Sequence, residues 1–118
     1  MTAENAGNAE LIEWADFAKV LLVAGTVLRV EAFPEARRPA WKVWVDFGPY
    51  GVRKSSAQIT DLYRSEDLPG RQVIGVINFP KKQIGPFQSE FLLTGFPTPE
   101  GVVVSTVERP VPNGTRMA

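Results

Sequence analysis

Residues with the chemistry to contact a nucleic acid lie close together between residues 76 and 90. An apolar run ends within this stretch, a proline-bounded loop follows, and a second apolar run begins after it. The stretch contributes an amide, two lysines, a hydroxyl and a carboxylate, namely Asn78, Lys81, Lys82, Ser89 and Glu90. Lysines bind phosphates, and amides hydrogen-bond to bases. This combination is typical of sites that recognise single strands.

The same stretch also permits a purely structural interpretation. Ile84 and Phe87 have the size of apolar plugs for a protein core, in which case Asn78 and Ser89 would satisfy loop backbone groups. The two lysines would then be solvated. Residue types alone favour this structural interpretation, because such groupings are common in loops.

Most cations lie on the part of the chain that carries this stretch. The chain has 13 basic and 13 acidic residues and therefore no net charge, which argues against a strong general attraction for nucleic acids. Residues 1–36 carry two basic and six acidic groups, net −4, whereas residues 37–88 carry nine and four, net +5. Residues 89–118 carry two and three, net −1. The central segment is thus the basic part of a neutral chain.

The composition excludes several catalytic classes. With no cysteine and no histidine, the chain lacks the usual ligands of zinc, copper, haem and iron–sulfur clusters, thiol nucleophiles and an imidazole base. We therefore expect no cofactor and no metal site. An enzymatic alternative would rest on carboxylates whose spacing does not indicate a working pair: Asp46, Asp61, Glu66, Asp67 and Glu90. A non-catalytic protein is the expectation.

The length and the start of the chain indicate one intracellular domain. At 118 residues the chain has the usual size of a single domain. Residues 1–12 are expected to form a flexible tail before a domain of residues 13–118. This start lacks the pattern of a secretory signal, and the longest apolar stretch, residues 20–25, is too short to span a bilayer. The absence of cysteine fits a reducing compartment, so we expect a cytoplasmic protein.

The periodicity of apolar residues predicts a mostly β domain. A short helix is expected where Trp14 and Phe17 recur at helical spacing, and a second of two or three turns after the capping-box pattern of residues 55–58. Gly25 lies within the first strand, where glycine often marks a bulge. The predicted strands are residues 20–30, 41–47, 52–55, 73–77, 91–96 and 102–107. This order predicts an all-β fold, a five-stranded Greek-key barrel of the OB-fold type with short added helices.

The predicted strand at residues 41–47 carries an aromatic residue on its polar face. Apolar residues alternate along it, which puts Trp41 on the apolar face and Trp44 on the other face with Lys42 and Asp46. A tryptophan in that position is equally compatible with ligand contact and with burial at a subunit interface or beneath a loop.

Four separated motifs together resemble the CsaA family of export-related chaperones. One is the order Asn-Phe-Pro-x-basic-x-Ile-x-x-Phe-x-Ser-Glu, which begins at Asn78, and the others are residues 33–39, 51–60 and 109–115. That family is similar to the tRNA-binding domains of methionyl-tRNA synthetases and to the EMAP II cytokine domain. The resemblance extends over residues 14–118. It implies an OB barrel, a homodimer and no catalytic activity.

The resemblance also implies a set of RNA-binding residues. Those that match the family's nucleic-acid motif are Asn78, Lys82, Ser89 and Glu90. The supporting cations are Arg37, Arg38, Lys42, Arg53 and Lys54. The chain departs from the family's pattern at Pro86, where glycine is usual, and at Gln88, where a basic residue is frequent. Loss of that cation removes one phosphate contact, which Lys81 can offset. The implied partner is tRNA or another structured RNA.

The same family is regarded as binding unfolded or preprotein segments, which calls for an apolar groove. Residues able to line one are Trp41, Trp44, Phe79, Ile84 and Phe87. A base and an apolar peptide side chain pack on an aromatic ring in similar ways, so the sequence leaves both ligands open. We expect an export-related chaperone with a tRNA-binding OB-fold. The alternative is a trans-acting tRNA-binding factor with no chaperone role.

The two ends of the domain are the candidates for dimerisation. Both expose apolar residues, and in the resembling family these regions meet across a two-fold axis. The expected interface residues are Trp14, Phe17, Pro110, Val111, Pro112 and Met117. The alternative is that both ends pack back on their own barrel.

Overall fold

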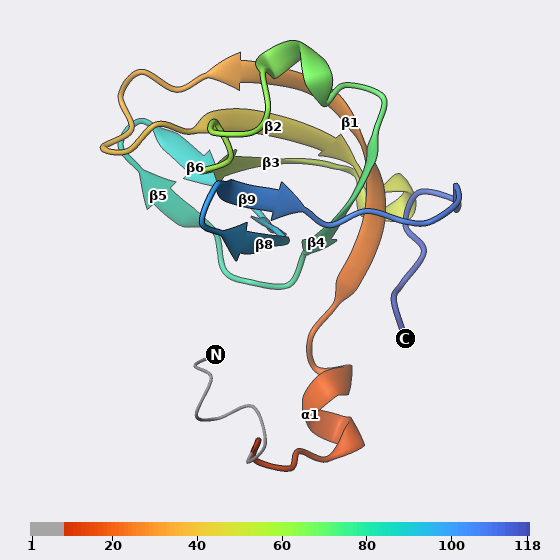
Figure 1. Cartoon of the computed structure of the whole chain (residues 1–118). Helices are drawn as coiled ribbons and strands as arrows, with labels where there is room; N and C mark the ends of the chain where they lie inside the picture. The colour runs from red at the N-terminus through yellow and green to blue at the C-terminus, as the bar shows by residue number, and fades with distance from the viewer. Residues whose placement is uncertain (1–8) are drawn as a thin grey trace.

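A curled antiparallel sheet forms the body of the protein, in a computed structural model that describes residues 9–118 (Figure 1). Its five strands have the order β3-β2-β1-β4-β7, and two separate hairpins, β5–β6 and β8–β9, complete the β structure. The strands are β1 (Leu22–Ala32), β2 (Trp41–Asp46), β3 (Val52–Ala57), β4 (Gln72–Val76), β5 (Lys82–Ile84), β6 (Phe87–Ser89), β7 (Leu92–Leu93), β8 (Gly95–Thr98) and β9 (Gly101–Val104). The helical elements are α1 (Trp14–Ala18) and the 3₁₀ turns η2 (Gly48–Tyr50) and η3 (Ser65–Asp67). The all-β OB-fold predicted from the sequence is confirmed.

Strand β1 holds the barrel together because it pairs with β4 along its first half and with β2 along its second half. The register with β2 shifts between Val27 and Arg29, so the predicted bulge exists but does not lie at Gly25. Gly25 permits a close approach instead. A Cβ atom there would lie 2.6 Å from Val45 Cγ1 and 2.7 Å from the carbonyl oxygen of Asp46.

The main core fills the barrel with the inward-facing side chains of these strands. Val43 and Val45 on β2, and Phe47 just after it, are fully buried, which confirms the alternation predicted for this strand. Phe91 packs edge-to-face on Phe47, with ring centroids 5.0 Å apart. Strand β4 is buried at four of its five residues, as its continuous apolar run predicts.

The helix predicted after residues 55–58 is wrong. Ser55 and Ser56 lie inside β3, which continues to Ala57, so neither serine is in a position to cap a helix. Ile59 is buried, and the Tyr63 hydroxyl accepts a hydrogen bond from the Val104 N–H at 3.0 Å. The packing of these side chains on the barrel overrides their helical spacing. The connection to β4 contains the short turn η3 in place of the helix.

The strand predicted over residues 91–96 is divided into two. Strand β7 pairs with β4, and the Thr94 N–H then donates to the Ile74 carbonyl at 3.0 Å. The chain leaves the barrel sheet after this point, because β8 turns back to pair with β9. The last predicted strand is correspondingly short and ends at Val104.

The two ends of the described chain behave differently. Helix α1 projects away from the barrel on a connection of residues 19–21 (Figure 1). Residues 11–18, which include this helix, are called the arm below. The C-terminal segment runs along β1, where the Gly114 N–H donates to the Ala24 carbonyl and the Met117 N–H to the Leu22 carbonyl, both at 2.8 Å. Residues 1–8, most of the expected tail, lie outside the described residues. Within residues 9–118, no helix has the length and apolar character needed to cross a membrane.

Candidate functional site

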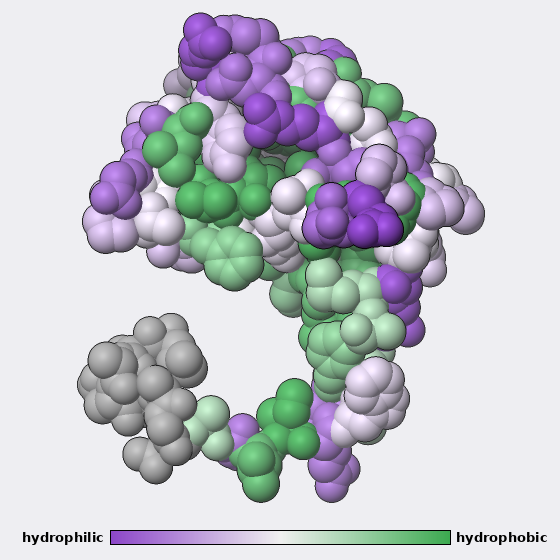
Figure 2. All heavy atoms as spheres, turned by 45° about the vertical axis from the view of Figure 1, so that its right-hand side comes forward, coloured by the Kyte–Doolittle hydropathy of each residue, from purple (hydrophilic) through white to green (hydrophobic). Residues whose placement is uncertain are grey.

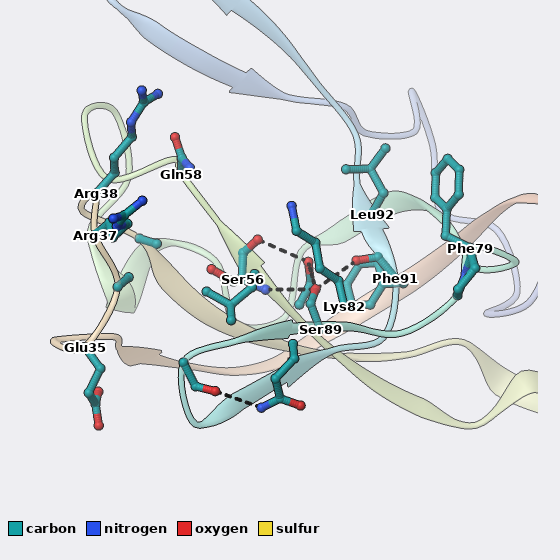
Figure 3. A pocket seen from close by; sticks show the side chains of 17 residues that line it. Glu35, Arg37, Arg38, Ser56, Gln58, Phe79, Lys82, Ser89, Phe91 and Leu92 are labelled. Carbon is teal, nitrogen blue, oxygen red and sulfur yellow. Dashed lines mark hydrogen bonds between the residues drawn. The ribbon is translucent and has the colours of Figure 1, made fainter.

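A groove of about 980 Å³ opens beside β3 (Figure 3). One wall is residues 35–40 of the β1–β2 loop, the other is residues 79–85, and residues of β3 and 89–92 lie between them. OB-folds bind oligonucleotides on the face of their second and third strands, between the two loops that form these walls. The volume is at the upper end of the range for small-ligand pockets. The groove can therefore hold a short segment of a polymer.

Three cations line the groove without an ion-pair partner among the described residues. Arg37 and Arg38 stand at one end, and Lys82 lies between them and the other end (Figure 3). All three side chains are exposed, and none of them forms an ion pair within residues 9–118. Glu35 is the one acidic side chain among the described lining residues. The groove is therefore positively charged and suited to phosphate groups.

The end of the groove away from the two arginines is apolar. Phe79 and Leu92 are both found there (Figure 3), and their side chains are 55% and 50% exposed. Ile84 is half-buried in the wall, and Phe91 is buried behind it. Large apolar side chains exposed in a concave site indicate contact with a ligand.

Ser89 and Glu90 join the far wall to β3. The Ser89 hydroxyl lies 3.4 Å from both the Ser55 hydroxyl and the Ser56 N–H. The Glu90 N–H donates to the Lys54 carbonyl at 2.8 Å, and Glu90 Oε1 accepts from the Lys54 N–H at 3.2 Å. These contacts continue the barrel where β3 would otherwise present a free edge. Ser89 also lines the groove, whereas Glu90 does not.

A second apolar cluster lies beside the groove and is called the aromatic cluster below: Phe33, Trp44 and Phe87. The ring centroids of Phe33 and Phe87 are 5.3 Å apart, and those of Trp44 and Phe87 are 6.2 Å apart. Phe87 lies on β6, with Lys42 Nζ of β2 5.5 Å and Lys54 Nζ of β3 5.2 Å from its ring centroid. These cation–π contacts hold the β5–β6 hairpin, which carries the far wall, against β2 and β3.

Neither tryptophan of β2 is open to the groove. Trp41 faces the main core, and its Nε1 donates to the Tyr63 carbonyl at 2.8 Å. The guanidinium of Arg29 lies over the Trp44 ring, 3.8 Å from its centroid, while Phe87 approaches the same ring edge-on. The tryptophans and Phe87, three of the five expected peptide-binding residues, therefore support the groove without lining it. The groove brings the other two, Phe79 and Ile84, together.

Several residues expected to bind RNA are engaged within the protein. Arg53 Nη1 donates to the Ile77 carbonyl at 2.5 Å, and Lys81 Nζ lies 3.7 Å from Glu90 Oε2. Asn78 hydrogen-bonds to the connection between α1 and β1. Lys42 and Lys54 lie on the aromatic cluster. Of the expected set, the groove brings together Arg37, Arg38, Lys82 and Ser89.

Sequence reasoning missed other residues of this region. Gln58, Gln83 and Leu92 line the groove, and no sequence signal separates Leu92 from its buried neighbours in an apolar run. Arg29 was counted with an acidic segment, but β1 pairs it directly with Trp44 on β2. Cross-strand neighbours of this kind cannot be read from local spacing.

The expected interface residues fall into two groups. Trp14 and Phe17 pair on the arm, with ring centroids 5.4 Å apart, and Trp14 is 71% exposed. Apolar residues are prominent where the arm leaves the barrel (Figure 2). Val111 is tied to its own barrel by two hydrogen bonds with the Gln72 side chain, at 2.7 and 2.9 Å. The exposed members of the tail are Pro110, Pro112 and Met117.

Four of the five carboxylates of the enzymatic alternative, all except Asp61, have structural partners among the described residues. Asp46 accepts from the Gly48 N–H at 2.8 Å in a turn, and Asp67 accepts from the Arg64 N–H at 2.8 Å. Within residues 9–118, no group of three or more acidic side chains is arranged to hold a metal ion. These contacts are typical of turn and capping residues.

Comparison with known proteins gives two kinds of relative. Residues 22–116 match the family described as "Putative tRNA binding domain". The chain is 39% identical over 87 residues to the methionine–tRNA ligase of Myxococcus xanthus, but it spans only 12% to 17% of the length of the six ligases compared. Among solved structures it is similar to the CsaA chaperone of Bacillus anthracis, with 42% identity and a TM-score of 0.86. The CsaA chaperone protein of Picrophilus torridus gives 38% and 0.87.

Both CsaA comparisons cover 92% of this chain and 100% of the other chain. The chain therefore belongs to the tRNA-binding domain family and, within it, to the CsaA group.

Proposed function

We propose that this chain is a non-catalytic binding protein of the CsaA type whose groove binds an exposed segment of a structured RNA such as tRNA. One observation carries the proposal: a single groove has along it three cations that form no ion pair within residues 9–118, and an exposed aromatic ring at one end. Single-stranded nucleic acids offer both features, since phosphates are charged and bases have flat apolar faces. Membership in the tRNA-binding domain family supports RNA as the ligand.

Each part of the groove has a role in this mechanism. Arg37, Arg38 and Lys82 contact phosphates, and a base released from its stack packs on Phe79. The chain has no net charge, so long-range attraction is weak and the binding depends on these local contacts. The affinity is consequently moderate and falls steeply with salt.

The test is tRNA affinity across a salt series for the wild type, Lys82→Ala and Arg109→Ala. Arg109 is an equally cationic control whose side chain is exposed, pairs with Glu108 and does not line the groove. Lys82→Ala should lower the salt slope by about one unit, because one phosphate contact is lost. Arg109→Ala should leave the slope as in the wild type. Undetectable binding at low salt, or an unchanged slope in Lys82→Ala, would contradict the proposal.

A second candidate function is the binding of an unfolded or preprotein segment, consistent with an export-related chaperone. It is favoured by Phe79 and Leu92, which expose apolar surface that a folded protein normally buries. The two similar CsaA proteins are named chaperones. An extended peptide would place an apolar side chain between Phe79 and Leu92 and acidic residues near the arginines.

Competition separates the two functions. An apolar peptide that binds at Phe79 and Leu92 should be displaced by tRNA and should bind about tenfold more weakly to Leu92→Ser, which removes apolar contact area. Tryptophan fluorescence reports the binding, because Trp44 packs on Phe87 of the hairpin that carries the far wall. If neither the fluorescence signal nor the aggregation of a denatured client changes, the chain is a tRNA-binding factor alone.

The proposal includes a homodimer formed through the arm in the cytoplasm, where tRNA and newly made polypeptides are both present. Leu11 and Ile12 are exposed beside Trp14, an apolar surface that a second copy could cover. Sedimentation of Trp14→Ser should show a weaker dimer than the wild type. Phe96→Ser is the matched control, since Phe96 is similarly exposed but lies on the β8–β9 hairpin. A wild type that sediments as a monomer would contradict the dimer.

A further inference from the structure

The Asn78 side chain makes both of its hydrogen bonds to the connection that carries the arm. Its Oδ1 accepts from the Leu21 N–H at 3.0 Å, and its Nδ2 donates to the Lys19 carbonyl at 2.7 Å. These partners are 57 and 59 residues away in the sequence. Because an amide both accepts and donates, one asparagine can hold two backbone groups of an irregular segment in place.

The same residue comes directly before the far wall of the groove, residues 79–85. Phe79, the exposed aromatic ring of the groove, follows it directly, and the Ile77 N–H before it donates to the Leu21 carbonyl at 3.1 Å. Residues 77–79 therefore contact the arm connection on one side and the groove on the other. A ligand that shifts the backbone at Phe79 also shifts the amide that holds Lys19 and Leu21.

The arm has a second tie that does not involve the groove. Arg116 Nη2 donates to the Ala18 carbonyl at 2.6 Å, at the end of α1. Arg116 belongs to the C-terminal segment, which pairs with β1 through Val23. Two side chains thus hold the arm and its connection, Asn78 next to the groove wall and Arg116 in the tail, and the two can be removed separately.

We propose that Asn78 is a positioning residue that couples the groove to the arm, so that ligand binding in the groove and self-association through the arm influence each other. Asn78 does not contact the ligand. It sets the direction in which the arm leaves the barrel, and a ligand on Phe79 changes that direction through it. Coupling of this kind is reciprocal: the factor by which the ligand changes self-association is the factor by which self-association changes ligand affinity. The coupling between ligand binding and self-association rests on the proposed function, namely an RNA-binding groove and a dimer.

The structural part can be tested without any ligand. Hydrogen exchange in Asn78→Ala should be about 5- to 30-fold faster at the amide of Leu21 and also faster in the β5–β6 hairpin, the paired part of the wall, since two hydrogen bonds that join the segments are lost. Arg116→Ala should accelerate exchange in α1 and leave the wall unchanged. If Asn78→Ala affects only Leu21 and not the wall, the coupling is refuted.

Arm motion can be followed with a single label, because the chain has no cysteine of its own. A dye on Ala15→Cys reports the arm alone. Saturating tRNA should change the fast segmental phase of the anisotropy decay of this dye, which is separate from the slower tumbling of the whole complex, in the otherwise wild-type protein and in Arg116→Ala, but not in Asn78→Ala. Asn78→Asp keeps the acceptor for Leu21 and loses the donor for Lys19, so its response should be intermediate. A role limited to stability would lower the melting temperature and leave this tRNA response intact.

The outcomes separate this inference from the proposed function. If tRNA does not bind or the protein does not self-associate, the proposed function fails, while the exchange pattern of Asn78→Ala still decides whether Asn78 joins the wall to the arm. If tRNA binds, and the dissociation constant of the dimer is the same with and without it, the coupling is overturned although the proposed function stands.

Discussion

The main core and the aromatic cluster are both apolar, but they differ in what surrounds them. The main core lies inside the barrel, and its largest fully buried side chain, Phe47, packs edge-to-face on the buried ring of Phe91. The aromatic cluster lies outside the sheet beneath the β5–β6 hairpin, and Lys42, Lys54 and Arg29 cover its rings. The first cluster makes the fold stable, whereas the second holds a wall of the groove with cations that remain near solvent.

This difference explains why several expected RNA-binding cations do not line the groove. Lys42 and Lys54 contact aromatic rings, and Arg53 holds the Ile77 carbonyl. Their positive charge still contributes to the potential around the groove, but under the proposed function direct phosphate contact is left to Arg37, Arg38 and Lys82, which line it. The following tests separate the roles of the two clusters, from the largest expected effect to the smallest.

Phe47→Ala should have the largest effect on stability. Removal of a fully buried ring that packs on Phe91 leaves a cavity and should cost about 3–5 kcal/mol of unfolding free energy, measured by urea denaturation. Phe96→Ala is the control, since Phe96 is exposed and should change stability by about 0.5 kcal/mol or less. Equal losses in the two variants would mean that the barrel interior is not the main source of stability.

Phe87→Ala should lower the unfolding free energy less than Phe47→Ala does, and it should weaken tRNA binding more. Its ring packs on two aromatic residues and two lysines outside the barrel, so we expect a loss of about 3 kcal/mol or less. The freed hairpin should weaken tRNA binding about tenfold, because the wall that carries Lys82 is no longer fixed. Folded Phe47→Ala protein should retain its affinity. If both variants lose affinity equally, the aromatic cluster has no separate role.

The cations should divide into binding and structural groups. Arg37→Ala and Arg38→Ala should each lower the tRNA salt slope by about one unit and leave unfolding unchanged, because both side chains are exposed and unpaired within residues 9–118. Arg53→Ala should reduce stability by about 1–3 kcal/mol, since the buried Ile77 carbonyl loses its partner. A reversed pattern would place the RNA on the barrel and not in the groove.

Lys81 and Lys82 should differ although they are adjacent. Lys81 is paired with Glu90, whereas Lys82 lines the groove. Lys81→Ala should therefore change the salt slope by well under one unit, while Lys82→Ala lowers it by about one. Filter binding at four salt concentrations measures both slopes. A larger effect for Lys81→Ala would show that RNA displaces Glu90 from Lys81.

Asp67 should give the smallest effect, because it lies in η3, outside both clusters. The hydrogen bond from the Arg64 N–H, with the charges of Arg64 and Arg71, lowers the pKa of Asp67 from its ordinary value of 3.8. The folded pKa is below the unfolded one, so the stability from this carboxylate is full above pH 3.8 and is lost as the pH falls through the lowered value. The difference in urea midpoint between wild type and Asp67→Asn should shrink on acidification from about pH 6 to pH 3. A constant difference would contradict the shift.

Local sequence patterns predicted the barrel strands well and the connections poorly. The alternation of β2 and the continuous apolar run of β4 each extend over several residues, so these patterns suffice to predict which side chains are buried. The capping-box pattern of residues 55–58 is a comparably clear helix signal. However, β3 extends through Ser55 and Ser56, and both residues pair with β2. An isolated local motif is overridden when a neighbouring strand offers more hydrogen bonds and more burial.

The sequence by itself determined that the chain is a β-rich barrel of the CsaA type, that its basic residues are concentrated in the central segment, and that histidine and cysteine chemistry is absent. Only the tertiary structure decided which of those residues meet. Arg37, Arg38, Lys82 and Phe79 come together because two loops that are distant in the sequence meet beside β3, while Asn78 bonds the connection to the arm and Trp44 lies beneath Arg29. Side-chain identity is a local property, but the partner that a side chain finds depends on strand register and loop closure, which no local spacing encodes.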